Sequence, residues 1–267
     1  MEKLSDEGYL HAHYIPIMAL SFVVTVVSYY IVTPMLSRKY CQKYVTLSST
    51  ERADWNSRSY STINSLLVSA FCIYDLVWNR DLQANPIWSS NAWATNIACS
   101  IMAGYMLADM IFVVTDFTFQ EAVAFSIHHA VVVLGVAYTV LLGVLPYFTA
   151  YRLLAELSNP FINTWVFIVT SGYPKNHPSA VATGIAMTFA FFLCRIAAMP
   201  VYYFMVYTTL GTPEFFRLTW DVRLTWLVVS VTLDCLNILW FTKLMRGATK
   251  QLTEMKKDRK QFTNKAA

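Results

Sequence analysis

Charged residues are scarce in this sequence. Aspartate, glutamate, lysine and arginine together make up 13% of the 267 residues, which is about half the share found in ordinary globular domains. Hydrophobic residues make up 56%, and apolar runs of about 20 residues, the length that crosses a bilayer, recur along nearly the whole chain. The composition therefore excludes an ordinary soluble domain and predicts an all-α membrane protein with one domain.

Cysteine is scarce too, and familiar site motifs are missing. The five cysteines include no CxxC pair and no zinc-type spacing, so neither a disulfide framework nor a zinc site is expected. The chain has no Gly-rich phosphate loop, no serine nucleophile elbow and no dinucleotide fingerprint. We therefore expect no metal and no resident cofactor. The first apolar run is also too long for the core of a signal peptide, so no cleaved leader is expected.

The apolar runs predict about seven transmembrane helices. Proline lacks a backbone N–H and disturbs a helix, so Pro200 predicts a kink or an early exit in the sixth of them. The predicted helices lie at about 14–36, 60–79, 93–115, 121–142, 146–170, 180–208 and 219–245.

The basic residues indicate the topology. The net charge is only +4, and most lysines and arginines lie in two segments, 38–58 and 246–265. Basic flanks of membrane spans are typical of the cytosolic side, which explains both segments better than nucleic-acid binding does. Seven spans place the two segments on the same side, so we expect a lumenal N-terminus and a cytosolic C-terminus. The predicted organisation is a short acidic segment at 1–13, a membrane domain at 14–245 and a basic cytosolic tail at 246–267.

Several ionisable side chains fall inside the predicted spans. Each unpaired charge at a helix centre costs about 2.5–3.5 kcal/mol on insertion scales, so these groups must pair, protonate or line a wet cavity. Their distribution over several helices predicts a bundle or barrel with a polar interior. Two purely structural pairings are alternatives to a functional role, Arg152 with Glu156 and Asp234 with Arg195. The six residues are Asp75, Asp109, Arg152, Glu156, Arg195 and Asp234.

The most informative motif is the dipeptide His128-His129 inside the apolar stretch 123–142. Neighbouring helical residues point about 100° apart, so only one histidine can lead into a given site. The next helix carries four polar residues spaced by four, three and four positions, which places them on one face of an α-helix. A polar stripe facing a histidine pair inside a bilayer is a functional hypothesis by default. The four are Arg152, Glu156, Asn159 and Asn163.

Acyl transfer is the reaction that this set of residues favours. A neutral imidazole near a carboxylate can act as a general base or a nucleophile. The histidines are expected roughly 11–12 Å below the cytosolic edge, close to the reactive ends of lipids and acyl thioesters. The predicted catalytic residues are His128, His129 and Glu156, with membrane lipids as partners and acyl-CoA as the co-substrate. The predicted substrate-binding residues are Asp109, Arg152, Asn159, Asn163, Arg195 and Asp234.

The ordered motifs of the chain resemble the TLC domain family, to which the ceramide synthases belong. The resemblance covers about residues 50–245 and rests on the histidine pair and, most specifically, on the block from Arg152 to Asn163. Further matching pieces are Trp55-Asn56-Ser57-Arg58, Asn85-Pro86-Ile87-Trp88, Arg195-Ile196-Ala197 and Asp234 with Asn237. The resemblance implies residence in the endoplasmic reticulum and a role in lipid synthesis, sensing or transport. In ceramide synthases the histidine pair is catalytic in N-acylation by acyl-CoA, which implies this role for His128 and His129.

One departure from that pattern leaves two classes of function open. Ceramide synthases carry a His-Asp-x-x-Asp segment where this chain has Ala155-Glu156-Leu157-Ser158-Asn159, so ceramide synthase activity is not predicted. The alternative to an acyltransferase is a non-catalytic lipid-binding, sensing or transport protein that keeps the TLC fold without turnover. A seven-helix receptor is disfavoured, because the loop before 146 is short and has no cysteine to attach it to the third helix. Assembly into a homo-oligomer is left open.

Overall fold

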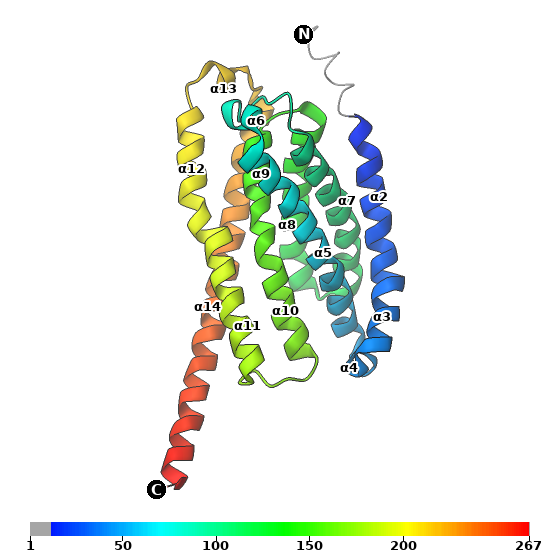
Figure 1. The fold of residues 1–267 in the computed structure, drawn as a ribbon, viewed down its shortest axis with the longest axis vertical. Coiled ribbons are helices and arrows are strands. Elements are labelled where there is room, and N and C mark those ends of the chain that lie inside the picture. Colours follow the sequence, from blue (N-terminus) through cyan, green and yellow to red (C-terminus); the bar gives the residue numbers. More distant parts are fainter. Residues whose placement is uncertain (1–11, 267) are drawn as a thin grey trace.

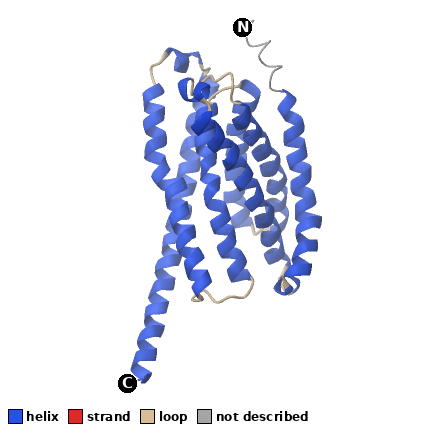
Figure 2. Ribbon diagram, viewed as in Figure 1, coloured by secondary structure: helices blue, strands red, loops and turns tan. Residues whose placement is uncertain are grey.

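The computed structural model describes residues 12–266, and within this range every regular element is a helix (Figure 2). The prediction of an all-α membrane protein is confirmed. Six of the helices are long and apolar enough to cross a membrane, and they run roughly side by side in one bundle (Figure 1). These six are Ile15–Tyr40, Ser49–Trp78, Trp93–Asp116, Ala122–Leu142, Pro178–Thr209 and Trp220–Thr253.

The first half of the chain crosses the bundle four times (Figure 1). The first crossing contains a π-helical turn, and a short helix at its lower end leads into the second crossing. The elements are α2 (Ile15–Val27), η2 (Ser28–Val32), α3 (Thr33–Tyr40), α4 (Gln42–Val45), α5 (Ser49–Trp78), α6 (Arg80–Ala84), α7 (Trp93–Asp116) and α8 (Phe119–Leu142).

The second half brings the chain down, up and down again, and its last helix extends far below the rest of the bundle (Figure 1). Its elements are α9 (Pro146–Leu153), η3 (Leu154–Ser158), α10 (Asn159–Thr170), α11 (Pro178–Phe191), η4 (Phe192–Ala197), α12 (Ala198–Thr209), α13 (Pro213–Arg217) and α14 (Trp220–Ala266).

The seventh predicted helix, at 146–170, is helical throughout but is not a continuous α-helix. A 3₁₀ segment, Leu154–Ser158, separates α9 from α10. A 3₁₀ helix has 3.0 residues per turn rather than 3.6, so residues four positions apart no longer lie above one another. The predicted single polar face from Arg152 to Asn163 is therefore broken.

Two predicted helix boundaries are wrong. The second helix begins at Ser49 rather than 60, because Ser48 and Glu51 form a capping box in which the Glu51 carboxylate accepts from the Ser48 N–H at 2.8 Å. The last helix continues to Ala266 rather than ending at 245. Hydrophobicity marks the part of a helix inside the membrane and gives no signal for its polar ends.

Of the two alternatives predicted at Pro200, an early exit does not occur, because α12 continues past this residue to Thr209. A π-helical turn at Phe192–Ala197 lies just before α12, and the regular hydrogen-bond ladder is already altered there.

The bundle is closely packed around α7. Gly104 lies where α7 meets α2, and a Cβ atom at this position would be 2.2 Å from the carbonyl oxygen of Met18. Ala98, Cys99 and Ala103 on the same helix are small residues buried in the hydrophobic core. Close backbone approach requires such small side chains. The half of the bundle around α7 is consequently compact, and the remaining helices pack against it.

Candidate intramembrane site

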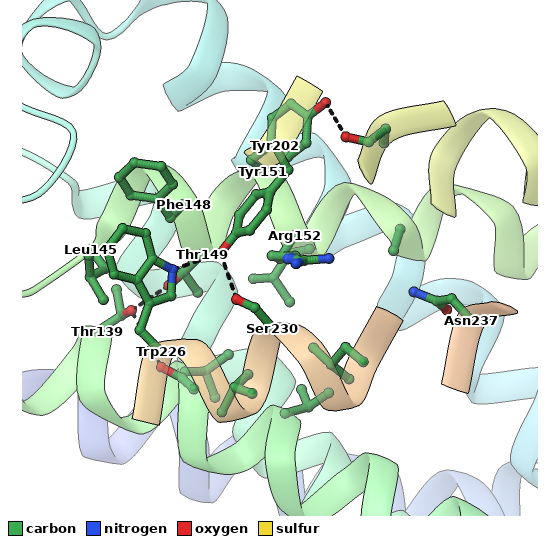
Figure 3. Close-up of a pocket in the computed structure, with 18 of the residues that line it drawn as sticks. Thr139, Leu145, Phe148, Thr149, Tyr151, Arg152, Tyr202, Trp226, Ser230 and Asn237 are labelled. Atoms are coloured by element: carbon green, nitrogen blue, oxygen red, sulfur yellow. Dashed lines mark hydrogen bonds between the residues drawn. The ribbon is translucent and has the colours of Figure 1, made fainter. Parts of the chain in front are cut away.

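Two cavities lie among the helices on the other side of α7. The upper cavity has a volume of about 100 Å³ and lies between α8, α9, α12 and α14 (Figure 3). The lower cavity is much larger, about 1090 Å³, and is lined by α5, α7, α8, α10, α11 and α14. Most of the residues on both walls are apolar, which suits the hydrophobic part of a lipid.

Three polar side chains belong to the walls of both cavities. They are His128 on α8, Glu156 on η3 and Arg195 on η4. Each comes from a different segment of the chain, and two of these segments depart from α-helical geometry. The boundary between the cavities is therefore polar, and it contains one of the two adjacent histidines.

His129 is fully engaged by hydrogen bonds. Its Nδ1 lies 2.5 Å from the carbonyl oxygen of Phe125, and its Nε2 lies 2.9 Å from Oδ2 of Asp109. A carbonyl oxygen only accepts, so Nδ1 carries a proton, and one further proton is shared between Nε2 and the carboxyl group. Ser57 donates to the other oxygen of Asp109 at 2.6 Å. His129 thus has no free nitrogen and joins α8 to α7.

His128 has a different environment. Its Nδ1 is buried and has no hydrogen-bond partner within the described part of the chain. The ring lies perpendicular to that of His129, with ring centroids 5.7 Å apart, and packs edge-on against Trp240 at 5.2 Å. Of the two histidines, His128 is therefore the one whose ring nitrogen is available to a bound molecule.

Glu156 lies in a polar cluster in which its carboxylate is held from two sides. Its Oε2 accepts from the Ser65 hydroxyl and from the Asn159 amide, both at 2.8 Å. Its Oε1 is 4.0 Å from Nη2 of Arg195. Only 5% of Glu156 is exposed, so the arginine and the two donors together compensate a buried negative charge.

Arg195 is buried and uses both ends of its guanidinium group. It donates from Nε to Ser158 at 2.9 Å, from Nη1 to Asn237 at 3.1 Å and from Nη2 to Asn159 at 2.9 Å. These partners come from η3, α14 and α10, so the side chain ties three segments together. The planar fork of arginine is suited to such fixed multidentate contacts.

The buried arginines pair with other carboxylates than the sequence predicts. Arg152 pairs with Asp234, to which it donates two hydrogen bonds, and Asp234 also accepts from Tyr203 at 2.6 Å. Arg195 faces Glu156 instead of Asp234. Both pairings predicted from the sequence, Arg152 with Glu156 and Asp234 with Arg195, are therefore wrong. The 3₁₀ segment explains this, because it turns Glu156 away from the face that Arg152 occupies.

Asn163 lies lower in the bundle and connects α10 to α5. Its amide donates to Thr62 at 3.0 Å, and its oxygen accepts from Arg58 at 3.2 Å. Arg58 also pairs with Asp54 at 2.8 Å. Arg58 lies in one of the motifs of the TLC resemblance, although the sequence analysis did not assign it to the site.

The structure brings most, but not all, of the predicted site residues together. Arg152 lines only the upper cavity, and Asp234 lines neither cavity because it lies behind Arg152. The remaining predicted residues line the lower cavity, namely Asp109, His128, His129, Glu156, Asn159, Asn163 and Arg195. Sequence reasoning missed the serines that donate to the buried carboxylates, since serine is common on membrane helices and carries no distinctive spacing.

Asp75 shows that a buried acid need not belong to this site. It is completely buried, and its Oδ2 accepts from the backbone N–H and the hydroxyl of Thr95, both at 2.7 Å, while Asn79 donates to its Oδ1 at 3.0 Å. It lines neither cavity. Among the described residues there is also no group of three or more metal-ligating side chains; the expectation that the protein needs no metal stays a prediction.

Apolar helices long enough to cross a membrane, arranged around cavities with polar residues at their boundary, define a multi-pass integral membrane protein. The chain belongs to the TLC domain family, whose family model matches residues 54–246. The resemblance inferred from the motifs is thereby confirmed.

Its relatives span nearly the whole chain. It is 37% identical over 250 residues to TLC domain-containing protein 4-B of Danio rerio, covering 93% of this chain and 94% of that protein. It is 31% identical over 245 residues to TLC domain-containing protein 4 of Homo sapiens, covering 92% and 93%. A more distant relative, Topoisomerase I damage affected protein 4 of Saccharomyces cerevisiae, is 24% identical over 247 residues, covering 86% and 82%. No solved structure matches the chain.

Proposed function

We propose that the chain is a membrane-embedded acyltransferase that moves an acyl group from a thioester such as acyl-CoA to a lipid amine or hydroxyl, with His128 as the general base. The observation that carries the proposal is that His128 lines both cavities and that its buried Nδ1 has no partner among the described residues. A general base needs a nitrogen lone pair within reach of the proton that it removes.

The lower cavity suits the acyl donor in size and in polarity. Its volume of about 1090 Å³ is at the upper end of the range for ligand pockets. Its walls carry apolar side chains such as Met187, and three lysines line its lower end, Lys175, Lys243 and Lys250. An acyl chain would lie among the apolar residues with its carbonyl carbon at His128, and the lysines would face the phosphates of the carrier.

The remaining polar residues would position the reacting groups. His129 has both nitrogens occupied, so it holds α8 in place and thereby orients its neighbour His128. Arg195 is fixed by three hydrogen bonds at the cavity boundary, where a guanidinium group would favour negative charge developing on a carbonyl oxygen. Glu156, assigned above to the catalytic set, would act by holding Arg195.

A specific observation favours a second candidate, a lipid-binding protein without turnover. Among the described residues, no carboxylate lies within ion-pair distance of His128, and Asp109 pairs with His129 instead. Catalytic bases are usually oriented by a third group. In this alternative the same cavity would bind a lipid and release it unchanged.

The two candidates are separated by an acyl-transfer assay on purified protein in lipid nanodiscs, combined with lipid analysis of expressing cells. We expect His128→Gln to abolish the conversion at unchanged protein abundance. His177→Gln is the matched control, because His177 lies in the loop below the bundle and lines neither cavity, and it should retain full activity. Equal conversion by wild type and His128→Gln would contradict the proposal, and co-purified lipid without any conversion would establish the second candidate.

We further propose residence in the endoplasmic reticulum with a lumenal N-terminus and a cytosolic C-terminus. The basic residues at 38–58 and in the tail support this orientation. A glycosylation acceptor site added before α2 should be modified, and a tag after α14 should be accessible to protease from the cytosolic side. The reverse pattern would contradict the orientation, and localisation to another organelle would contradict the residence.

A further inference from the structure

The upper cavity is small, and its polar wall residues largely satisfy one another. Tyr202 accepts a hydrogen bond from Trp226 at 2.7 Å and shares one with Ser230 at 2.9 Å (Figure 3). On α8 and α9, the hydroxyl groups of Thr139 and Thr149 are 2.7 Å apart. These groups therefore need no ligand, and together with the aromatic rings they form a largely apolar surface.

Two residues on this wall each have one buried polar atom with no partner in the described part of the chain. One atom is the Nε–H of Arg152, a donor, and the other is Nδ1 of His128, an acceptor in the tautomer that can take up a proton. Both atoms are buried. A buried polar atom without a hydrogen bond costs about 1–3 kcal/mol, so an occupant with both an acceptor and a donor would stabilise this cavity.

The charges around the upper cavity select against a cationic occupant. Arg152 and Arg195 both line it, whereas Asp234, the partner of Arg152, lies outside its wall. Among the described residues on the wall, Glu156 is the single acid. An ammonium group has no lone pair with which to accept from the Arg152 Nε–H and would lie beside two guanidinium groups, while a neutral hydroxyl group can accept from the Arg152 Nε–H and donate to His128.

We infer that the upper cavity binds the acceptor of the reaction, and that this acceptor is an uncharged lipid alcohol and not an amine. The inference rests on the proposed function and narrows its substrate. A cavity of about 150 Å³ holds a benzene molecule, so the upper cavity of about 100 Å³ admits the hydroxyl group and its first few carbons.

The reaction at the cavity boundary then follows with all atoms accounted for. The acceptor hydroxyl gives its proton to Nδ1 of His128, and its oxygen forms a bond to the carbonyl carbon of the acyl thioester in the lower cavity. The bond between that carbon and the thioester sulfur breaks. The sulfur leaves with the bonding electron pair and takes the proton from His128, so the products are an ester and a thiol.

The test uses a long-chain alcohol carrying a photoreactive diazirine near its hydroxyl end, and the amine of the same chain, with the full-length protein in nanodiscs. Mass spectrometry locates the labelled residues. We expect the alcohol to label the upper wall, for example Val136, Thr149 or Val229, and the amine to label it at least about tenfold less, as expected for the loss of one or two hydrogen bonds.

Arg152→Lys is the decisive variant, because it keeps a cation opposite Asp234 and removes the Nε–H. It should weaken labelling by the alcohol about tenfold. Arg223→Lys is the matched control, since the Nε of Arg223 is also buried without a partner among the described residues but Arg223 lines neither cavity, and it should label like wild type. Equal labelling by amine and alcohol, or no labelling of the upper wall because only water enters it, would overturn the inference.

A turnover assay with the same two probes separates this inference from the proposed function. Esterification of the alcohol with no amide product supports both. Amide formation would uphold acyl transfer but overturn the alcohol acceptor. If neither probe is acylated by the wild-type protein, the acyltransferase proposal fails, and the labelling pattern still decides which molecule the upper cavity binds.

Discussion

The half of the bundle around α7 and the half between α8 and α14 are built from the same kinds of residues. The first half is closely packed, whereas the second half contains cavities. In α7, 67% of the most apolar segment is buried, whereas in α14 only 17% is. The first half is closed by contacts such as that of Gly104 with α2, whereas the second half encloses the upper cavity and, together with one face of α5 and α7, the lower cavity. Buried polar groups occur in both halves. Burial alone therefore does not distinguish a polar group with a structural role from a candidate site residue, whereas its surroundings do.

Asp75 and Glu156 illustrate this difference. Both are buried carboxylates held by hydroxyl and amide donors. Asp75 is enclosed at the end of α5 by its neighbours, whereas Glu156 also faces an arginine across the boundary of two cavities. A carboxylate inside a membrane bundle thus becomes a candidate for function when a cavity reaches it.

The largest effect is expected from overfilling the compact half. In Gly104→Leu the new Cβ would meet the backbone oxygen of Met18 at 2.2 Å, and a backbone atom cannot be moved without separating α2 from α7. We expect no folded protein in detergent by size-exclusion chromatography. Gly135→Leu, on the wall of the upper cavity where the nearest atom is a Val229 methyl group at 3.3 Å, should still fold. Equal yields of folded protein for Gly104→Leu and Gly135→Leu would contradict the difference in packing between the two halves.

The next effect concerns the contact that joins the halves. His129→Leu leaves Asp109 buried without its partner, and breaking a buried pair costs about 3–5 kcal/mol. His128→Leu removes a ring whose Nδ1 has no partner among the described residues, so it should cost less than about 1.5 kcal/mol. Thermal unfolding of the two variants measures the difference. Partial recovery in the double variant His129→Leu/Asp109→Leu would identify the unpaired carboxylate as the cause.

A smaller effect is expected for Asp75→Asn. The amide oxygen can still accept from Thr95, but the new NH₂ group would face the amide of Asn79, leaving a donor unsatisfied at a cost of about 1–3 kcal/mol. The melting temperature should fall while the conversion per folded molecule stays unchanged. A loss of conversion in the folded variant would show that the compact half takes part in the chemistry.

The smallest effect lies outside the membrane spans. The Ser89 hydroxyl donates to Asp81 at 2.7 Å and holds the pKa of this carboxyl below its usual value, with further hydrogen bonds from Asn85 and backbone N–H groups. A depressed pKa stabilises the fold above the pKa of the unfolded chain, and this contribution is lost as the pH falls through the folded value. Thermal unfolding between pH 7 and about pH 3 should show a small decrease that Asp81→Asn abolishes; an identical pH dependence in the variant would contradict it.

The sequence was sufficient for the all-α membrane architecture, because long apolar runs mark the segments that prefer a bilayer; it was not sufficient for the number of spans, since among the described residues six helices and not seven are long and apolar enough to cross. The start of α5 was missed because Glu51, Asp54 and Arg58 make its first turns polar, although Ser48 and Glu51 carry the capping signal. The ion-pair partners could not be predicted, since they depend on a 3₁₀ segment that the tertiary packing imposes on a sequence with an ordinary α-helical spacing.

The two histidines were equivalent in the sequence and are not equivalent in space. Their adjacency indicated that only one would face a given site, but it could not indicate which one. That choice depends on Asp109, twenty positions away on another helix, which engages His129 and leaves His128 without an acidic partner. Long-range side-chain contacts of this kind determine the site, and local periodicity does not contain them.

The unbroken α14 has a mechanical consequence. The helix forms part of the lower cavity wall and continues as one rod to Ala266, roughly 45 Å beyond Asn237 at 1.5 Å per residue. A tilt of about 5° at the cavity would displace the far end of such a rod by about 4 Å. Any tilt of α14 in the membrane would therefore be enlarged at the projecting end, where a spin label or fluorophore would measure it.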